Sequence, residues 1–316
     1  DFVEGDGSSE EVDVVKDYKE RLTKDIVLKK PLRVGVDAGN GTAGVAAVPI
    51  LRAIGCEVHE LFTEPDGTFP NHEPDPTVAD NMKHLVDLVR KHKLDVGIGF
   101  DGDGDRIGII DENGHMIYGD QLLIIFARDI LSRKPGAVFI SEVKCSQTMY
   151  DDIEKHGGKA IMWKTGHSLI KGKMKEEKAD LAGEMSGHMF FADRYYGFDD
   201  ATYAACRLVE IMSNTGKTIN QLLDGVPETF STPEIRVDCP DDEKFDVVKK
   251  VTDYFKSHNY DVIDIDGARV KFEGGWGLVR ASNTQPVLVL RFEALSSERL
   301  EEIKGHVERV VAEMRR

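Results

Sequence analysis

The hydrophobic and polar residues of this chain form short blocks that predict alternating strands and helices. In the first part of the chain, strands are predicted at 32–37, 57–62 and 96–100, and the last of these is an apolar run typical of a buried strand. Segments typical of helices stand at 12–28, 43–54 and 120–131. A further helix is expected to start near Thr77, which can cap it, and to run to about His92. Such an alternation is typical of an α/β domain.

The same order of elements returns in the middle of the chain. A strand is predicted at 137–141, a helix at 146–155, a glycine turn at 157–158 and a second strand at 159–163. This order repeats that of 32–61, which suggests two related α/β domains. The second of them is expected to end with a helix over 202–212.

The pattern changes near 225–233. A strand at 234–237 and a helix at 242–257 are followed by several short strands up to 294 and a helix at 297–314. Helices set apart from an antiparallel sheet predict an α+β domain. The fold class is therefore α/β, with two related mixed α/β domains followed by a smaller α+β C-terminal domain. The expected parts are a linker and helix over 1–30 and domains over 31–134, 135–228 and 229–316.

Composition narrows the range of partners. The 316 residues carry a formal net charge of −16, which argues against binding to nucleic acid or to an anionic membrane surface. The four cysteines form no CxxC motif and suggest neither a zinc site nor a disulfide framework. With no signal peptide and no bilayer-spanning run, a cytoplasmic location is expected. The chain opens without Met on an acidic, Gly- and Ser-containing stretch, which suggests a linker whose upstream part has been removed.

The stretch at 99–111, GFDGDGDRIGIID, is the strongest chemical signal. Asp101, Asp103 and Asp105 alternate with glycines, so that in a near-extended backbone their carboxylates point the same way. Three converging negative charges need a cation, and oxygen ligands favour a hard ion such as Mg2+. The strand at 96–100 would deliver the loop at its carboxyl end, where open α/β sheets place ligand groups.

Two alternatives to a Mg2+ loop exist for this stretch. With Glu112 at the twelfth place, the spacing approaches that of an EF-hand calcium loop. An EF-hand, however, needs glycine at its sixth position, where this chain has Arg106, and helices on both sides, where this chain has apolar strand-like runs. The other alternative is a solvated acidic turn. The Mg2+ reading is favoured.

Three further loops carry groups that could take part in chemistry. His167 follows a predicted strand and could move a proton or bind an anion, although a turn histidine at a helix start is the plain alternative. The segment 183–188, GEMSGH, offers a carboxylate, a hydroxyl and an imidazole, unless it is only a polar hairpin. The segment 280–284, RASNT, offers donors for a phosphate dianion, unless it is only a charged hairpin. Lys144 also follows a strand, but alone it means little. No Walker A or dinucleotide motif supports nucleotide binding.

Taken together and in this order, these loops resemble those of the α-D-phosphohexomutase family, and within it the phosphomannomutase/phosphoglucomutase branch. DGDGDR at 101–106 is similar to the family's Mg2+ loop, GEMSGH at 183–188 to its sugar-recognition loop and RASNT at 280–284 to its phosphate-binding loop. VKCS around Lys144 and KTGHS around His167 match family active-site segments. The Met of GEMSGH is similar to the manno/gluco branch, whereas phosphoglucosamine mutases more often carry Gln there.

The resemblance implies a phosphohexomutase that moves phosphate between C1 and C6 of a hexose, through a phosphoserine and a bisphosphorylated sugar. The implied partners are the 1- and 6-phosphates of mannose or glucose and the bisphosphate intermediate. The implied metal ligands, all for Mg2+, are Asp101, Asp103 and Asp105. The implied catalytic residues lining the cleft are Arg106, Lys144 and His167. The implied substrate-binding residues are Glu184, Ser186 and His188 for the sugar, and Arg280, Ser282, Asn283 and Thr284 for the phosphate that is not transferred.

One feature of the family is missing from this sequence. Members have four domains, and the first supplies a serine loop of the TASHNP type, of which we find no counterpart here. The chain therefore resembles domains 2 to 4 and is expected to be a catalytically incomplete fragment. The alternatives are a sugar-phosphate-binding protein without mutase activity and, within the family, a phosphoglucosamine mutase. The choices between mannose and glucose and between monomer and homodimer stay open.

Overall fold

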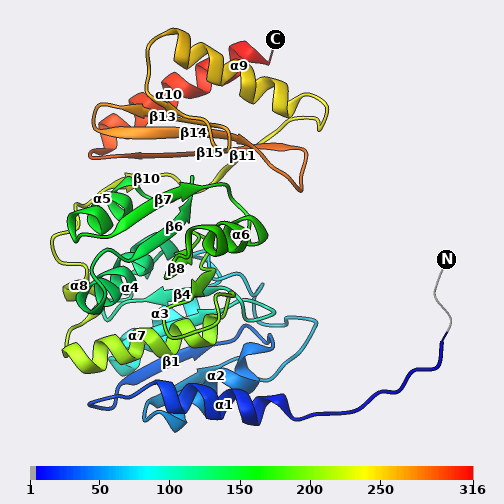
Figure 1. The fold of residues 1–316 in the computed structure, drawn as a ribbon, viewed down its shortest axis with the longest axis vertical. Helices are drawn as coiled ribbons and strands as arrows, with labels where there is room; N and C mark the ends of the chain where they lie inside the picture. The colour runs from blue at the N-terminus through cyan, green and yellow to red at the C-terminus, as the bar shows by residue number, and fades with distance from the viewer. Residues whose placement is uncertain (1–4, 316) are drawn as a thin grey trace. The chain divides into compact units, whose positions relative to one another are not determined.

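The computed structural model describes residues 5–315 (Figure 1). The chain forms two compact units. The first unit holds the residues up to Gly104 together with Ile109–Met116 and Thr202–Thr218. The second holds Asp105–Gly108, Ile117–Ala201 and the residues from Ile219 onward. None of the helices in the described part of the chain combines the length and the apolarity that crossing a bilayer requires.

The first unit contains most of a five-stranded sheet, in the order β2-β1-β3-β4-β5. Its strands are β1 (Arg33–Asp37), β2 (Glu57–Leu61), β3 (Val96–Phe100), β4 (Ile107–Ile110) and β5 (Met116–Ile117). The helices are α1 (Val14–Asp25), α2 (Ala43–Ala53), α3 (Lys83–His92) and α7 (Ala201–Thr215). Strand β1 pairs in parallel with both β2 and β3, and every residue of β3 is buried. The predicted strands and the helix after the first of them are confirmed.

The helix expected to start near Thr77 is the exception. Helix α3 begins only at Lys83, because Thr77 is engaged in a local turn and not in a cap. Its backbone N–H and its hydroxyl both donate to the Asp75 carboxylate, at 3.0 and 2.7 Å. An Asp side chain that binds the backbone two residues on favours a turn over a helix.

The second unit contains a four-stranded sheet in the order β7-β6-β8-β9. Its strands are β6 (Val138–Glu142), β7 (Lys159–Trp163), β8 (Leu181–Gly183) and β9 (Met189–Phe191), and its helices are α4 (Gly119–Arg133), α5 (Gln147–Lys155), α6 (His167–Glu177) and α8 (Ile219–Leu222). Strand β6 pairs in parallel with β7 and β8, and β8 pairs with β9 in the antiparallel direction. This order matches β2-β1-β3-β4 strand for strand, so the predicted relation between two α/β domains is confirmed.

The last part of the chain folds around an antiparallel sheet in the order β10-β15-β14-β13-β12, with β11 also paired to β15. Its strands are β10 (Phe230–Ser231), β11 (Ile235–Asp238), β12 (Val262–Ile263), β13 (Ala268–Phe272), β14 (Gly275–Ala281) and β15 (Val287–Ala294). Figure 1 shows its two helices, α9 (Lys244–Ser257) and α10 (Ser297–Met314), on one face of the sheet. The α+β prediction is confirmed.

The two faces of this sheet serve different purposes. On the helix side, Phe255, Leu290 and Val307 belong to one buried apolar cluster. On the other side, Trp276 and Leu278 pack against Val143, which follows β6. The C-terminal sheet thus covers the loop at the carboxyl end of β6.

His306 makes the stability of this C-terminal part depend on pH. Its ring lies among Phe255, Tyr260 and Phe272, and its Nε2 atom is buried without a hydrogen-bond partner in residues 5–315. Burial, together with the charge of Arg309, lowers the pKa of His306 below its ordinary value, which means that the fold prefers the neutral ring. Stability is therefore complete above the unfolded-state pKa of about 6.5 and is lost as the pH falls through the lower folded-state pKa.

We expect the free energy of unfolding of the wild type to fall, relative to that of His306→Gln, between pH 7 and pH 5. Denaturant titrations followed by tryptophan fluorescence at several pH values measure this difference. The other histidines contribute equally to the stability of both proteins, so their contribution cancels in the difference. A difference that stays constant over this range would contradict the assignment.

Candidate functional site

The two related domains present their polar loops at equivalent places. The acidic loop connects β3 to β4, and the GEMSGH loop connects β8 to β9, so each follows the third strand of its sheet. Within the second unit, Arg106 forms an antiparallel bridge with His188, and the Ile107 N–H donates to the Gly187 carbonyl at 3.2 Å. The residues that end the acidic loop therefore pair with the GEMSGH loop.

The acidic loop has the donor set that a hard cation needs. Asp101, Asp103 and Asp105 each offer one carboxylate oxygen, and these oxygens all lie within 4.8 Å of one another. The first unit ends at Gly104, but the three aspartates lie within five consecutive residues, so their spacing is set by the loop itself. Asp101 is buried and accepts from the Gly104 N–H at 3.0 Å, whereas Asp103 is exposed. Three oxygens converging at a strand end fit a divalent metal ion such as Mg2+.

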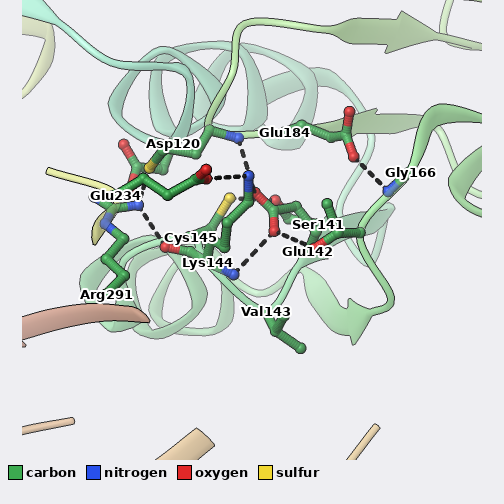
Figure 2. A network of polar contacts seen from close by, with 12 residues as sticks. Asp120, Ser141, Glu142, Val143, Lys144, Cys145, Gly166, Glu184, Glu234 and Arg291 are labelled. Atoms are coloured by element: carbon green, nitrogen blue, oxygen red, sulfur yellow. Dashed lines mark hydrogen bonds and ion pairs between the residues drawn. The ribbon is translucent and has the colours of Figure 1, made fainter. Parts of the chain in front are cut away.

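Lys144 sits in a buried network of carboxylates (Figure 2). Its ammonium lies 3.2 Å from Glu234 and 3.8 Å from Glu142. The backbone N–H of Lys144 also donates to the Glu142 carboxylate, at 3.0 Å. Burial alone would lower the pKa of Lys144, but the charges of Glu142 and Glu234 outweigh it and raise this pKa above its ordinary value. Lys144 is therefore a buried amine whose charged form is favoured by its carboxylate partners.

Glu142, at the end of β6, is the residue that joins these loops. Its Oε2 atom accepts from the Thr165 hydroxyl at 2.8 Å, and its Oε1 atom accepts from the Met185 N–H at 3.3 Å. The fully buried carboxylate thus touches the KTGHS segment and the GEMSGH loop as well as Lys144. Figure 2 shows Glu142, Lys144 and Glu234 converging. At the right of the view, the Glu184 carboxylate accepts a hydrogen bond from the Gly166 N–H.

Two buried arginines of the C-terminal sheet fix the Lys144 loop from the other side. Arg291 on β15 donates to the Lys144 carbonyl and lies 3.7 Å from Asp120. Arg269 on β13 donates to the carbonyls of Val143 and Cys145. The backbone that carries Lys144 is therefore anchored by a sheet that lies more than a hundred residues later in the chain.

Glu184 is buried and points toward the GEMSGH histidine. Its Oε1 atom accepts from the Gly166 N–H at 2.8 Å, and its Oε2 atom lies 3.9 Å from His188 Nε2. Burial, and then the charge of Glu142, raise the pKa of Glu184 above its ordinary value. Ser186, in the same loop, is half-buried.

His188 and His167 share one carboxylate, that of Asp199. The Nδ1 atoms of His188 and His167 lie 3.4 and 3.8 Å from Asp199, and the two rings stack with their centres 5.9 Å apart. Their exposure differs, since the side chain of His188 is 14% exposed and that of His167 is 56% exposed. Burial opposes protonation of His188, but Asp199 and Asp105 outweigh it and raise the pKa of His188.

Asp199 belongs to this pair more than to a second metal site. One atom each of Asp105, His188 and Asp199 also lie within 4.8 Å of one another. Asp199, however, already binds the Lys171 ammonium at 3.0 Å. Burial acts to raise the pKa of Asp199, but the nearby His188 and Lys171 outweigh it and hold this pKa far below its ordinary value. Asp199 is thus a carboxylate whose charge is compensated by Lys171 and that lies near both imidazoles.

The RASNT segment forms a tight turn at the end of β14. Arg280 is 5% exposed and Ser282 is also buried, whereas Asn283 and Thr284 are exposed. The Ser282 hydroxyl accepts from the N–H groups of Thr284 and Gln285, at 3.3 and 3.2 Å. A buried guanidinium beside exposed amide and hydroxyl groups is chemically suited to an anion.

Three family models match the chain in succession. Phosphoglucomutase/phosphomannomutase alpha/beta/alpha domain II matches residues 15–114, domain III of the same type matches 118–230, and the phosphoglucomutase/phosphomannomutase C-terminal domain matches 234–310. The chain belongs to the phosphoglucomutase/phosphomannomutase family.

Similar proteins agree with this family in sequence and in fold. The chain is 49% identical to a phosphomannomutase/phosphoglucomutase of Pseudomonas putida over 96% of its own length and 66% of the relative's. It is 42% identical to a phosphoglucomutase of Neisseria gonorrhoeae, covering 98% of the chain and 68% of the relative. A crystal structure of a Burkholderia thailandensis phosphoglucomutase/phosphomannomutase family protein superposes with a TM-score of 0.92 at 44% identity, covering 98% of this chain and 67% of that one. The chain thus spans about two thirds of the length of the relatives that it matches.

Within this family fold, the sequence had not singled out three carboxylates that organise the site: Glu142, Asp199 and Glu234. Glu142 stands two residues before Lys144 at a strand end, which is the one local signal that could have found it. Asp199 stands beside another acidic residue, Asp200, and Glu234 directly precedes a short strand, so neither carries such a signal.

Proposed function

We propose that this chain provides the metal-, sugar- and phosphate-binding parts of a phosphohexomutase that interconverts the 1- and 6-phosphates of mannose or glucose. The observation that carries the proposal is the buried Glu142 carboxylate, which holds Lys144, Thr165 and the GEMSGH loop around one point. A site of this kind presents a cation, a second carboxylate and two imidazoles to one ligand. The proposed domains are 31–134, 135–228 and 229–316, after a linker and helix over 1–30.

The charged residues have distinct proposed tasks. Asp101, Asp103 and Asp105 would hold Mg2+, which when bound would offset the charge of the phosphoryl group in transfer. Arg106 and Lys144 would line the cleft as fixed cations, and Lys144 is suited to this because its carboxylate partners keep it protonated. A cation buried before the substrate arrives needs little reorganisation when negative charge develops.

The polar residues would recognise the sugar and move the proton. Glu184 keeps its Oε2 atom toward His188, so it can accept bonds from sugar hydroxyls on that side, where Ser186 can also bind. The imidazoles of His167 and His188 share Asp199, which would orient them for proton transfer at a sugar hydroxyl.

The phosphate that stays on the sugar would bind to the turn at the end of β14. There the proposed ligands are Arg280, Ser282, Asn283 and Thr284. Arg280 supplies the only charge among them, and it is buried where its attraction is least screened by water.

Replacing Arg280 tests this function directly. We expect this chain to bind mannose 6-phosphate and glucose 1-phosphate in a calorimetric titration, and Arg280→Ala to lose about a hundredfold in affinity or more, because a charge-assisted phosphate contact disappears. The half-buried Arg299, which pairs with Glu302 and donates to the Glu273 carbonyl away from this turn, provides the control variant Arg299→Ala, whose affinity should match the wild type. If the wild type binds neither sugar phosphate, the proposed function is wrong.

A further inference from the structure

Asp266 is the partner of the proposed phosphate ligand Arg280. It lies in the turn between β12 and β13, and its Oδ2 atom accepts from Arg280 Nε at 3.0 Å. Among residues 5–315, no other hydrogen bond to the Arg280 side chain is found. The bond engages Nε and leaves both terminal nitrogens of the guanidinium to a ligand, which is the pair that a phosphate can bind in a bidentate way.

The same carboxylate oxygen has a second donor from another part of the site. Asp266 Oδ2 accepts from the Thr165 N–H at 3.0 Å. The Thr165 hydroxyl reaches Glu142, and the next N–H along the chain, that of Gly166, reaches Glu184. One atom of Asp266 therefore connects the phosphate-binding turn of the C-terminal sheet with the segment that holds the sugar-binding carboxylate.

The backbone beside Asp266 is shaped for this contact. Gly267 has a φ of +92°, and a Cβ atom there would lie 2.4 Å from the Val279 carbonyl oxygen and 2.8 Å from Arg280 Cα. Only glycine allows both this conformation and so close an approach to β14. The turn is thus pressed against the backbone of Arg280, which fixes where the Asp266 carboxylate can stand.

We propose that Asp266 is a positioning residue for phosphate recognition: it holds the Arg280 guanidinium with its terminal nitrogens available and ties this cation to the Thr165–Gly166 segment. The inference rests on the proposed role of Arg280 as the phosphate ligand. Sugar phosphate would then meet a cation whose orientation is already fixed, so that less side-chain freedom is lost on binding. The opposite role, that of a carboxylate which occupies the place of the phosphate, would need Asp266 on the terminal nitrogens.

Calorimetric titration with glucose 1-phosphate separates these roles. We expect Asp266→Ala to bind about tenfold more weakly than the wild type, which corresponds to the loss of one charged hydrogen bond, and Asp266→Asn to recover part of the loss because its amide oxygen can still accept. Asp264→Ala is the matched control, since Asp264 lies two residues away, is exposed and pairs with Lys256 at the surface. Its affinity should equal that of the wild type.

Hydrogen exchange of the ligand-free chain provides a readout that does not depend on ligand. The Thr165 amide should exchange faster in Asp266→Ala than in the wild type, and Asp264→Ala should leave it unchanged. A melting temperature within a few degrees of that of the wild type shows that a variant is folded. If Asp266→Ala does not fold, Asp266→Asn takes its place in both measurements.

The outcomes are distinct. Equal or tighter binding of glucose 1-phosphate by the Asp266 variants, with binding still lost in Arg280→Ala, overturns the positioning role and leaves the proposed function in place. Unchanged exchange at Thr165 overturns the coupling. If the wild type does not bind glucose 1-phosphate at all, the proposed function and this inference both fall.

Discussion

Asp103→Ala is expected to remove divalent-metal binding at the acidic loop while leaving the stability of the fold almost unchanged. Asp103 is exposed, and within residues 5–315 no hydrogen bond or ion pair of its side chain is found. Asp101, in contrast, is buried and bonded to the Gly104 N–H, so its loss would also disturb the loop. Replacing Asp103 therefore tests the metal without testing the fold.

The size of the effect follows from the ligand count. With three carboxylates reduced to two, we expect the affinity for Mg2+ or Mn2+ to fall at least about a hundredfold, since the ion loses both a ligand and a charge. In the proposed phosphohexomutase, interconversion of hexose phosphates should fall by roughly a thousandfold or more, because a metal contributes several kcal/mol to the phosphoryl-transfer transition state.

Titration with Mn2+, followed by its paramagnetic resonance, measures the affinity directly. Asp80→Ala removes another exposed carboxylate of the same domain, one that only pairs with Lys83, and should change nothing. Binding of mannose 6-phosphate should survive in both variants. Unchanged Mn2+ affinity, or interconversion at most of the wild-type rate in Asp103→Ala, would show that the acidic loop is not the metal site.

The fold could be predicted well where local signals and long-range packing agree. The strand at 159–163 and the helix at 297–314 have the bounds that their patterns predicted, because each lies between clear turn or cap signals. The helix expected from Thr77 failed because an Asp two residues earlier offers the backbone a competing turn.

The site could be predicted less completely. The loops were recognisable, but their partners come from distant parts of the chain: Arg291 reaches the Lys144 carbonyl across 147 positions, and Asp266 reaches Thr165 across 101. A buried arginine in a strand looks, in sequence, like an edge residue facing solvent. Only the fold shows that β13 and β15 turn such residues toward the loop after β6.

Gly187 is the position in the GEMSGH loop where a single methyl group should do the most damage. Its φ is +99°, and an added Cβ would lie 2.3 Å from the Ile107 carbonyl oxygen. The contact is with backbone on both sides, and the Ile107 N–H also donates to the Gly187 carbonyl, so neither chain can move away without breaking the bridge between Arg106 and His188.

We therefore expect Gly187→Ala to lower the free energy of unfolding by roughly 3 kcal/mol or more, from backbone strain and overpacking together, and to abolish binding of glucose 1-phosphate. Gly172→Ala is the matched control. Gly172 lies exposed in helix α6, where an added Cβ meets nothing within 4 Å, so the same substitution should stabilise the protein by about 0.5–1 kcal/mol.

Denaturant unfolding followed by fluorescence suits both variants, because Trp163 and Trp276 lie in the same unit as the two glycines. If Gly187→Ala were as stable as the wild type and still bound glucose 1-phosphate, the loop could reshape around a side chain, and the close pairing of the GEMSGH loop with the start of β4 would not be needed for recognition. A loss of stability in Gly187→Ala together with a gain in Gly172→Ala would instead show that this pairing requires glycine at position 187. The chemical change is identical in the two variants, and only the surrounding backbone differs.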